Sequence, residues 1–88
     1  MQVKQINYSS HFFRALKKLP KDQREILRKR EAIFKKDCFD PRLRTHKLNG
    51  NRKNYWSFSI THSHRVLFEF LSEGKVGFID LGDHSIYD

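Results

Sequence analysis

The sequence predicts one α+β domain in which a first strand and a helical hairpin pack on a mainly antiparallel sheet of about four strands. Three observations indicate this fold. Tyr55–Leu71 contains two runs with the period of half-buried strands, separated by a short turn. Two helical patterns with basic outer faces precede this stretch, and one more strand pattern follows it. Strands clustered after helices favour an antiparallel sheet with the helices on one face.

The N-terminal half reads as a strand followed by two helices. The strand is expected over residues 3–8. Ser9 and Ser10 offer a cap for the first helix, which Pro20 ends, and Asp22 is expected to cap the second. The apolar positions that recur at helical spacing, and so mark the buried faces, are Phe12, Leu16, Leu19, Ile26 and Ile33.

A polar, basic connector separates the helices from the central hairpin. Asp40-Pro41 ends the second helical pattern, and Leu43 and Leu48 are expected to anchor residues 42–54 to the core. The hairpin then presents an aromatic face for the helices to cover and a second face that carries hydroxyls. The residues expected on the aromatic face are Trp56, Phe58, Ile60, Val66, Phe68 and Phe70.

The last strand is expected over residues 75–81, after a turn at Ser72-Glu73-Gly74. Strict alternation places Val76 and Phe78 on one face, and Ile79 and Leu81 on the other. No repeat or long linker divides the chain, so residues 1–88 are expected to form a single domain.

The composition and charge of the chain bear on its cellular compartment and on the kind of partner it binds. Cys38 is the single cysteine, so no disulfide forms within the chain. Charges interrupt every apolar run, which excludes a membrane span and favours the cytoplasm. The net charge is +8, and residues 42–65 carry six Lys/Arg and no acid. Such a balance suits a polyanion or an acidic protein, although a solvated basic surface would have the same composition.

Four of the five histidines follow residue 45: His46, His62, His64 and His84. Histidine is the side chain whose ordinary pKa is closest to neutrality, so this group suggests acid/base chemistry. If the three strands are neighbours, these positions converge on one region of the sheet. A zinc site built on His62 and His64 is the alternative, but no Cys pair or HExxH pattern accompanies it, and no metal is expected.

Several local motifs resemble the RelE/ParE superfamily of toxins from type II toxin–antitoxin pairs. The matching segments, in chain order, are residues 12–20 (FFRALKKLP), 46–50 (HKLNG), 55–60 (YWSFSI), 64–70 (HRVLFEF) and 81–87 (LGDHSIY). The resemblance spans nearly the whole chain and implies a RelE-like fold. It also implies one of two activities, because RelE-like members cut messenger RNA on the translating ribosome, whereas ParE-like members inhibit DNA gyrase.

The histidine contexts favour the RNA-cutting branch. His46 and His84 stand in the H-x-L-x-G and L-G-x-H-S contexts of that branch, and Tyr87 matches its C-terminal aromatic position. Arg65 matches the strand arginine of the RNA cutters but occurs in ParE relatives as well. That branch usually carries an acid where Val66 or Leu67 stands, so the assignment of base and acid between the histidines stays open.

The resemblance thus predicts a toxin that acts as a ribosome-dependent, metal-independent endoribonuclease and needs no cofactor. His46 and His84 would serve as base and acid, Arg65 would stabilise the phosphate, and His64 and Tyr87 would position a nucleotide. The residues expected to contact RNA or the ribosome are Arg44, Lys47, Arg52 and Lys53.

The expected partners are an acidic antitoxin, messenger RNA and the ribosome with its 16S ribosomal RNA, without a membrane and without DNA except through the antitoxin complex. A ParE-like gyrase inhibitor and a non-catalytic basic RNA-binding domain are the alternatives.

Overall fold

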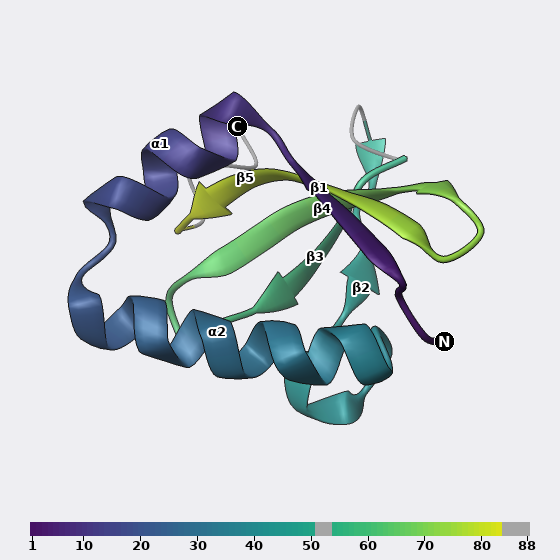
Figure 1. Cartoon of the computed structure of the whole chain (residues 1–88), viewed down its shortest axis with the longest axis horizontal. Coiled ribbons are helices and arrows are strands. Elements are labelled where there is room, and N and C mark those ends of the chain that lie inside the picture. Colours follow the sequence, from purple (N-terminus) through teal and green to yellow (C-terminus); the bar gives the residue numbers. More distant parts are fainter. Residues whose placement is uncertain (51–53, 84–88) are drawn as a thin grey trace.

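A short strand, two helices and four further strands follow one another along the described part of the chain (Figure 1). The computed structural model describes residues 1–50 and 54–83. The elements, in order, are β1 (Gln5–Tyr8), α1 (Ser10–Lys18), α2 (Lys21–Lys36), the 3-10 turn η1 (Pro41–Leu43), β2 (His46–Lys47), β3 (Trp56–Ser59), β4 (Arg65–Ser72) and β5 (Lys75–Gly82). The predicted α+β fold and its order of elements are confirmed.

The sheet of the described residues has the strand order β1-β5-β4-β3-β2. The pairs β2–β3, β3–β4 and β4–β5 are antiparallel, whereas β1 runs parallel to β5, with Tyr8 opposite Phe78. The sheet has five strands instead of about four because His46–Lys47 pairs with β3 and becomes an edge strand. A parallel neighbour cannot be joined by a tight hairpin, and here the whole chain between β1 and β5 makes the connection.

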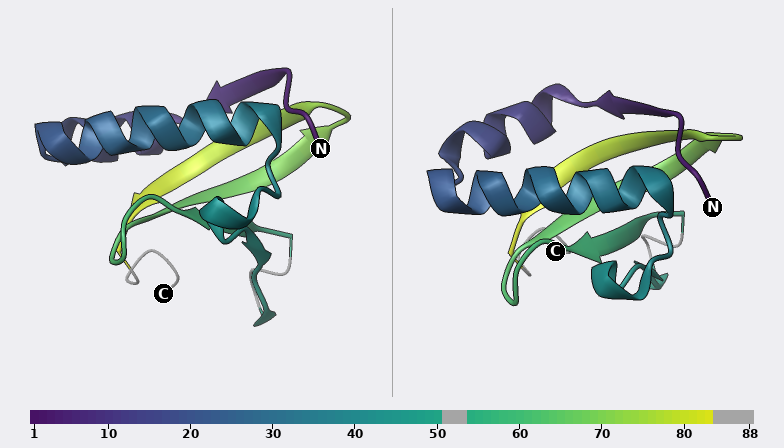
Figure 2. Two further views of the ribbon diagram at one scale, coloured as in Figure 1. Left: turned by 90° about the horizontal axis from the view of Figure 1, so that it is seen from below. Right: turned by 60° about the horizontal axis from the view of Figure 1, so that its bottom comes forward.

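Both helices lie on one side of the sheet (Figure 2). α1 begins as predicted, because the Ser9 side chain accepts a hydrogen bond from the Phe12 backbone N–H at 2.9 Å. The prediction that Asp22 caps α2 is wrong, since Pro20 holds the cap position and makes no side-chain cap bond. Asp22 lies in the first turn instead, where its negative charge favours the helix N-terminus. No helix in the described ranges is long and apolar enough to cross a membrane.

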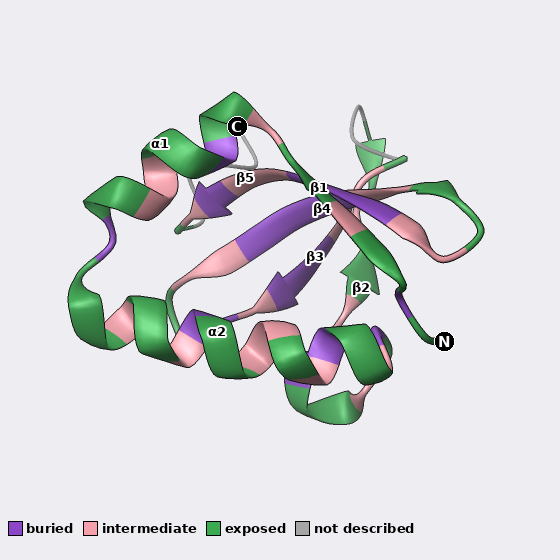
Figure 3. Cartoon of the chain, in the orientation of Figure 1, coloured by how far each residue is buried: buried purple, intermediate pink, exposed green. Residues whose placement is uncertain are grey.

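The core is aromatic and lies between the helices and the sheet (Figure 3). The Phe34 ring of α2 is fully buried, stacks on Phe58 at 4.8 Å between centroids, and meets Phe68 and Phe78 edge-on at 5.0 and 5.4 Å. Edge-on and offset stacked rings are the favourable arrangements for aromatic pairs. One helix residue therefore contacts three neighbouring strands.

The last strand departs from strict alternation. Phe78 pairs with Phe68 and Leu81 pairs with Val66, so the two β5 residues share the core face, although they are three positions apart. The register shift leaves Ile79 as an inserted residue, a β-bulge. The prediction that Leu81 faces away from Phe78 is wrong, because a bulge reverses the alternation of every residue after it.

Candidate functional site

Arg65 lies at the start of β4 on the sheet face opposite the aromatic core. It pairs with Ser59 on one side and with Gly82 on the other. Its guanidinium donates from one terminal nitrogen to the Ser59 hydroxyl at 3.0 Å, and its Nε is buried with no hydrogen-bond partner among the described residues. Gly82 has no side chain that could crowd the Arg65 guanidinium. Arg65 makes no ion pair with Glu69 of the same strand or with another carboxylate among the described residues, so its charge is not neutralised there.

His46 is held in one tautomer by its own loop. Arg44 takes the left-handed conformation with φ 53°, and its carbonyl lies 3.0 Å from His46 Nδ1. A carbonyl only accepts, so Nδ1 carries the proton and Nε2 of the neutral ring has a free electron pair. Nε2 lies 3.4 Å from the Oγ of Ser57, which is buried on β3. The exposed imidazole thus presents an acceptor nitrogen beside the sheet.

His46 and Arg65 stand on the same face of the sheet, on either side of β3. His46 pairs with Ser57, Arg65 pairs with Ser59, and these two serines are two positions apart on one strand. Strand and residue spacings put the Cα atoms of His46 and Arg65 about 12 Å apart. Because both side chains project from this face, they are within reach of the same phosphodiester group.

A groove, here called the basic groove, adjoins these two residues. It runs between α2, the η1 segment and the tip of the β3–β4 hairpin, and has a volume of about 880 Å³. It lies beside the half of β3 that β2 does not pair with, which is where Ser59 is found. Its cationic lining consists of Lys29, Arg30, Arg42, Arg44 and Arg65, and no carboxylate lines it among the described residues.

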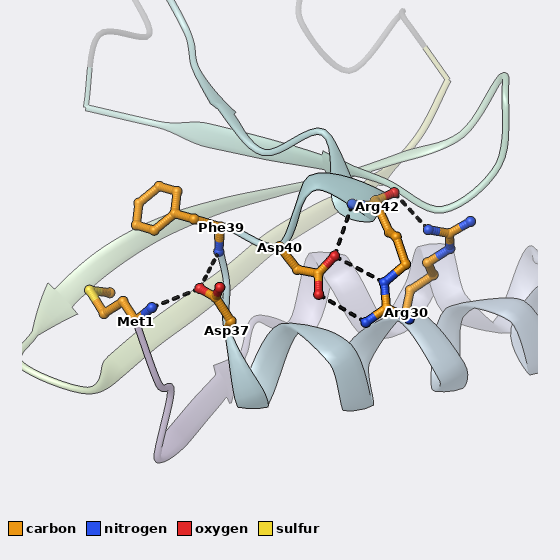
Figure 4. A network of polar contacts seen from close by, with 6 residues as sticks. All are labelled: Met1, Arg30, Asp37, Phe39, Asp40 and Arg42. Carbon is orange, nitrogen blue, oxygen red and sulfur yellow. Dashed lines mark hydrogen bonds and ion pairs between the residues drawn. The ribbon is translucent and has the colours of Figure 1, made fainter.

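A polar network holds one wall of the basic groove in place (Figure 4). Asp40 accepts from the Arg42 backbone N–H at 2.9 Å and from two nitrogens of the Arg42 guanidinium at 3.0 and 2.9 Å. Arg30 of α2 donates to the Arg42 carbonyl at 2.7 Å. The Arg42 side chain, and then its backbone N–H, lower the pKa of Asp40 to about 2. The same view shows Asp37 between the Met1 ammonium and the Phe39 N–H, at 2.7 and 3.0 Å.

The remaining predicted residues are distributed as follows. His64 precedes β4, and its Nδ1 lies 3.0 Å from the Ser63 hydroxyl. Lys47 is exposed on the edge strand β2. His62, which belongs to the alternative zinc site, is exposed and lines the basic groove. His84, Tyr87, Arg52 and Lys53 lie outside the described residues.

Within the described ranges, no three His, Cys, Asp or Glu side chains gather closely enough to hold a metal ion. The one histidine of the N-terminal half, His11 of α1, contacts Asp80 of β5 through its Nε2 at 3.3 Å. It therefore joins α1 to the sheet.

Sequence reasoning overlooked the clamp formed by Arg30, Asp40 and Arg42, and the place of Lys29 in the groove. Asp-Pro-Arg was read only as a helix stop. The sequence feature that could have predicted this clamp is an aspartate directly before a proline turn that contains an arginine. Such an aspartate caps the turn and can pair with the arginine.

Comparison by sequence finds no matching family and no matching curated protein. Comparison by structure finds toxins. YafQ from E. coli aligns with a TM-score of 0.76 and 18% identity over 98% of both chains. A YoeB/ParE toxin from Agrobacterium tumefaciens aligns with a TM-score of 0.77 and 18% identity, over 92% of this chain and 99% of that one.

An archaeal RelE, solved as a RelE–RelB complex from Pyrococcus horikoshii OT3, aligns with a TM-score of 0.73 and 15% identity over 94% and 96% of the two chains. The chain has the RelE/ParE toxin fold. Likeness at this identity establishes the fold alone, so the chemistry of this RelE/ParE-fold chain has to be argued from its own residues.

Proposed function

We propose that this chain is the toxin of a type II toxin–antitoxin system and a ribosome-dependent endoribonuclease that cuts messenger RNA without a metal. The observation that supports the proposal is that His46 and Arg65 stand on the same face of the sheet, on either side of β3. Neutral His46 presents Nε2 as an acceptor, and Arg65 presents a half-buried guanidinium without an ion-pair partner among the described residues, on the same sheet face. A base and a phosphate-binding cation are the two groups that cleavage by a ribose 2′-OH requires first.

The reaction follows from these two groups. His46 Nε2 takes the proton of the 2′-OH, and the 2′-oxygen attacks the adjacent phosphorus. The Arg65 guanidinium, whose planar fork matches two phosphate oxygens, balances the charge that builds there. The bond from phosphorus to the 5′-oxygen then breaks, which leaves a 2′,3′-cyclic phosphate on one fragment. His84 is the proposed acid that protonates the departing 5′-oxygen, and Tyr87 and His64 are the proposed nucleotide-positioning groups.

The partners follow from charge. The chain carries +8, and Arg44, Lys47, Arg52 and Lys53 flank the proposed centre in sequence. We assign these four cations to the backbone of messenger RNA and 16S ribosomal RNA. The RelE of the archaeal complex is bound to RelB, and an acidic antitoxin would similarly suit this basic surface.

The test is cleavage of a defined message in a purified translation system, read by primer extension. His46→Ala is expected to slow cleavage by about 10²–10⁴-fold, the usual contribution of a general base. Its fold should persist, because His46 is exposed. His11→Ala, which removes an imidazole on α1, is the matched control and should cleave at nearly the original rate.

Two results would overturn the proposal. An intact message together with gyrase-trapped DNA breaks would identify a ParE-like inhibitor. An RNA that is bound but not cut on the ribosome, by the unaltered chain, would identify a non-catalytic RNA-binding domain.

A further inference from the structure

The basic groove extends beyond the reach of His46, and the reaction just described uses only its Arg65 end. We propose that the rest of the groove is a second nucleotide subsite, which holds the RNA residue next to the one whose 2′-OH reacts. This inference rests on the proposed function and names the substrate unit that the neighbouring surface takes. Its volume of about 880 Å³ lies within the range of small-molecule pockets, roughly 300–1,000 Å³.

The cationic lining of the basic groove favours an anionic ligand. Arg42 is already paired with Asp40, and Arg30 already donates to the Arg42 carbonyl, so these two residues build the wall. Lys29 and Arg44 line the groove and make no side-chain ion pair in the described structure. These two cations are therefore the ones available to a ligand phosphate.

The basic groove also has an apolar floor, which favours a ligand with an apolar part. Ile26 and Ile33 of α2 and Ile60 of the hairpin lie among the cations. Ile60 is buried, whereas the two α2 isoleucines are half-exposed and present aliphatic surface to the groove. A free phosphate would leave this aliphatic surface exposed to water. A nucleotide covers it, because its flat base can lie on the isoleucines while its phosphate reaches Lys29 and Arg44.

The order of contacts along the RNA also follows. Arg65 and Ser59 belong both to the sheet face beside His46 and to the groove lining. Arg44 likewise lines the groove and holds the His46 ring through its carbonyl. An RNA strand that leaves the reaction centre past Arg65 thus enters the groove directly. The Asp40–Arg42–Arg30 clamp preorganises the wall it meets, which lowers the cost of binding.

The test measures binding of a 2′-O-methyl RNA hexanucleotide, which cannot be cut, to the purified full chain by fluorescence anisotropy. Lys29→Ala is expected to weaken binding roughly fivefold and to reduce the slope of log affinity against log salt by about 0.7. Lys17→Ala removes an exposed lysine of α1 outside the groove and is the matched charge control, with less than twofold change expected.

A second variant tests the base. Ile26→Ala is expected to weaken binding of the hexanucleotide about fivefold, yet to leave binding of an abasic hexamer unchanged, because only the base contacts the floor. Leu71→Ala, an exposed apolar residue outside the groove, is its control. If Ile26→Ala unfolds, Ile26→Thr, which keeps the branched shape, replaces it.

The outcomes separate this inference from the proposed function. Unchanged hexanucleotide binding in Lys29→Ala and Ile26→Ala, with ribosomal cleavage intact, overturns the subsite alone. Equal losses for the normal and abasic hexamers reduce the groove to a phosphate contact and overturn the nucleotide assignment. Tighter, Lys29-dependent binding of an octaglutamate peptide makes the groove an acidic-peptide site and overturns it too. If cleavage is absent but both variants weaken binding as expected, the groove is still a nucleotide site, whereas the proposed reaction fails and with it the position of that nucleotide next to a reacting residue.

Discussion

A single backbone conformation at Arg44 connects two parts of the candidate site. Its φ of 53° lies in the left-handed region, which is uncommon for a residue other than glycine. That conformation ends the η1 turn and directs the Arg44 carbonyl at His46 Nδ1. The backbone of Arg44, two residues before His46, thereby places the proton of the imidazole on Nδ1. The chemistry assigned to His46 depends on this contact as much as on the residue itself.

Asp40 is the other residue whose effect reaches beyond its own contacts, and its charge can be tested directly. We expect Asp40→Asn to lower the unfolding temperature at pH 7. Asparagine can still cap the η1 turn, but it carries no charge for Arg42. Because folding lowers the pKa of Asp40 from 3.8 to about 2, the stabilisation is complete above pH 4 and is lost as the pH falls toward 2.

The difference between Asp40→Asn and the original chain should therefore disappear near pH 2, as measured by circular dichroism at several pH values. Glu73→Gln, which neutralises an exposed carboxylate in the β4–β5 turn, is the control and should change little. A difference that stays constant from pH 7 to pH 2 would show that the charge of Asp40 has no part in stability.

At the scale of elements, the Ser9 side chain links the α1 N-terminus to the bulge of β5. The Ser9 hydroxyl accepts from the Phe12 N–H and donates to the Ile79 carbonyl at 2.7 Å, while the Ser9 backbone N–H donates to the Phe78 carbonyl at 3.0 Å. Ile79 is the bulged residue of β5. The cap of the helix thus also satisfies a backbone carbonyl that the bulge takes out of the ladder.

Ser9→Ala is expected to destabilise the chain by about 1–2 kcal/mol, because it removes the helix cap and leaves the Ile79 carbonyl without that donor. Urea unfolding followed by circular dichroism measures this change. Ser10→Ala, at the exposed first position of α1, should stay within roughly 0.5 kcal/mol of the original chain. Equal effects of the two substitutions would contradict the assignment of the cap to Ser9.

At the scale of the whole molecule, one aromatic layer joins both helices to the three central strands of the sheet. α2 contributes Phe34, α1 contributes Phe12, and strands β3, β4 and β5 contribute Phe58, Phe68 and Phe78. A domain of 88 residues buries a smaller fraction of its surface than a larger one, so large rings carry much of the hydrophobic stabilisation. The same layer fixes α2 over the hairpin, and with it the wall of the basic groove.

Phe34→Ala is expected to lower the free energy of unfolding by about 3–5 kcal/mol, because it leaves a cavity among three rings that cannot close. The measurement is urea unfolding at neutral pH. Phe13→Ala is the matched control, since Phe13 is 47% exposed, and it should cost less than about 1 kcal/mol. A loss below 1 kcal/mol for Phe34 would mean that the helix layer does not depend on this contact.

Local patterns in the sequence were sufficient for much of this structure. The hairpin, its aromatic face, the Ser9 cap and the placement of the helices on one face of the sheet could be predicted because each depends on neighbours in the chain: alternation, helical spacing and turn residues. The resemblance to RelE/ParE toxins was also readable from short motifs. His46 and Arg65 were named from their residue types and contexts alone.

Long-range pairing decided the rest. The parallel β1–β5 pair, the edge strand at His46–Lys47 and the bulge at Ile79 depend on which strands meet in space, which local alternation does not encode. The basic groove likewise combines Lys29 on α2, Arg42 and Arg44 near η1, and Arg65 on β4. In the sequence, Lys29 belongs to a basic helix face that resembles solvated surface, and no local pattern places it beside Arg44 and Arg65, which were assigned to RNA and phosphate. Only the packing of α2 against the hairpin gathers them around one cavity, because the hydrophobic contacts of Phe34 hold the two elements together.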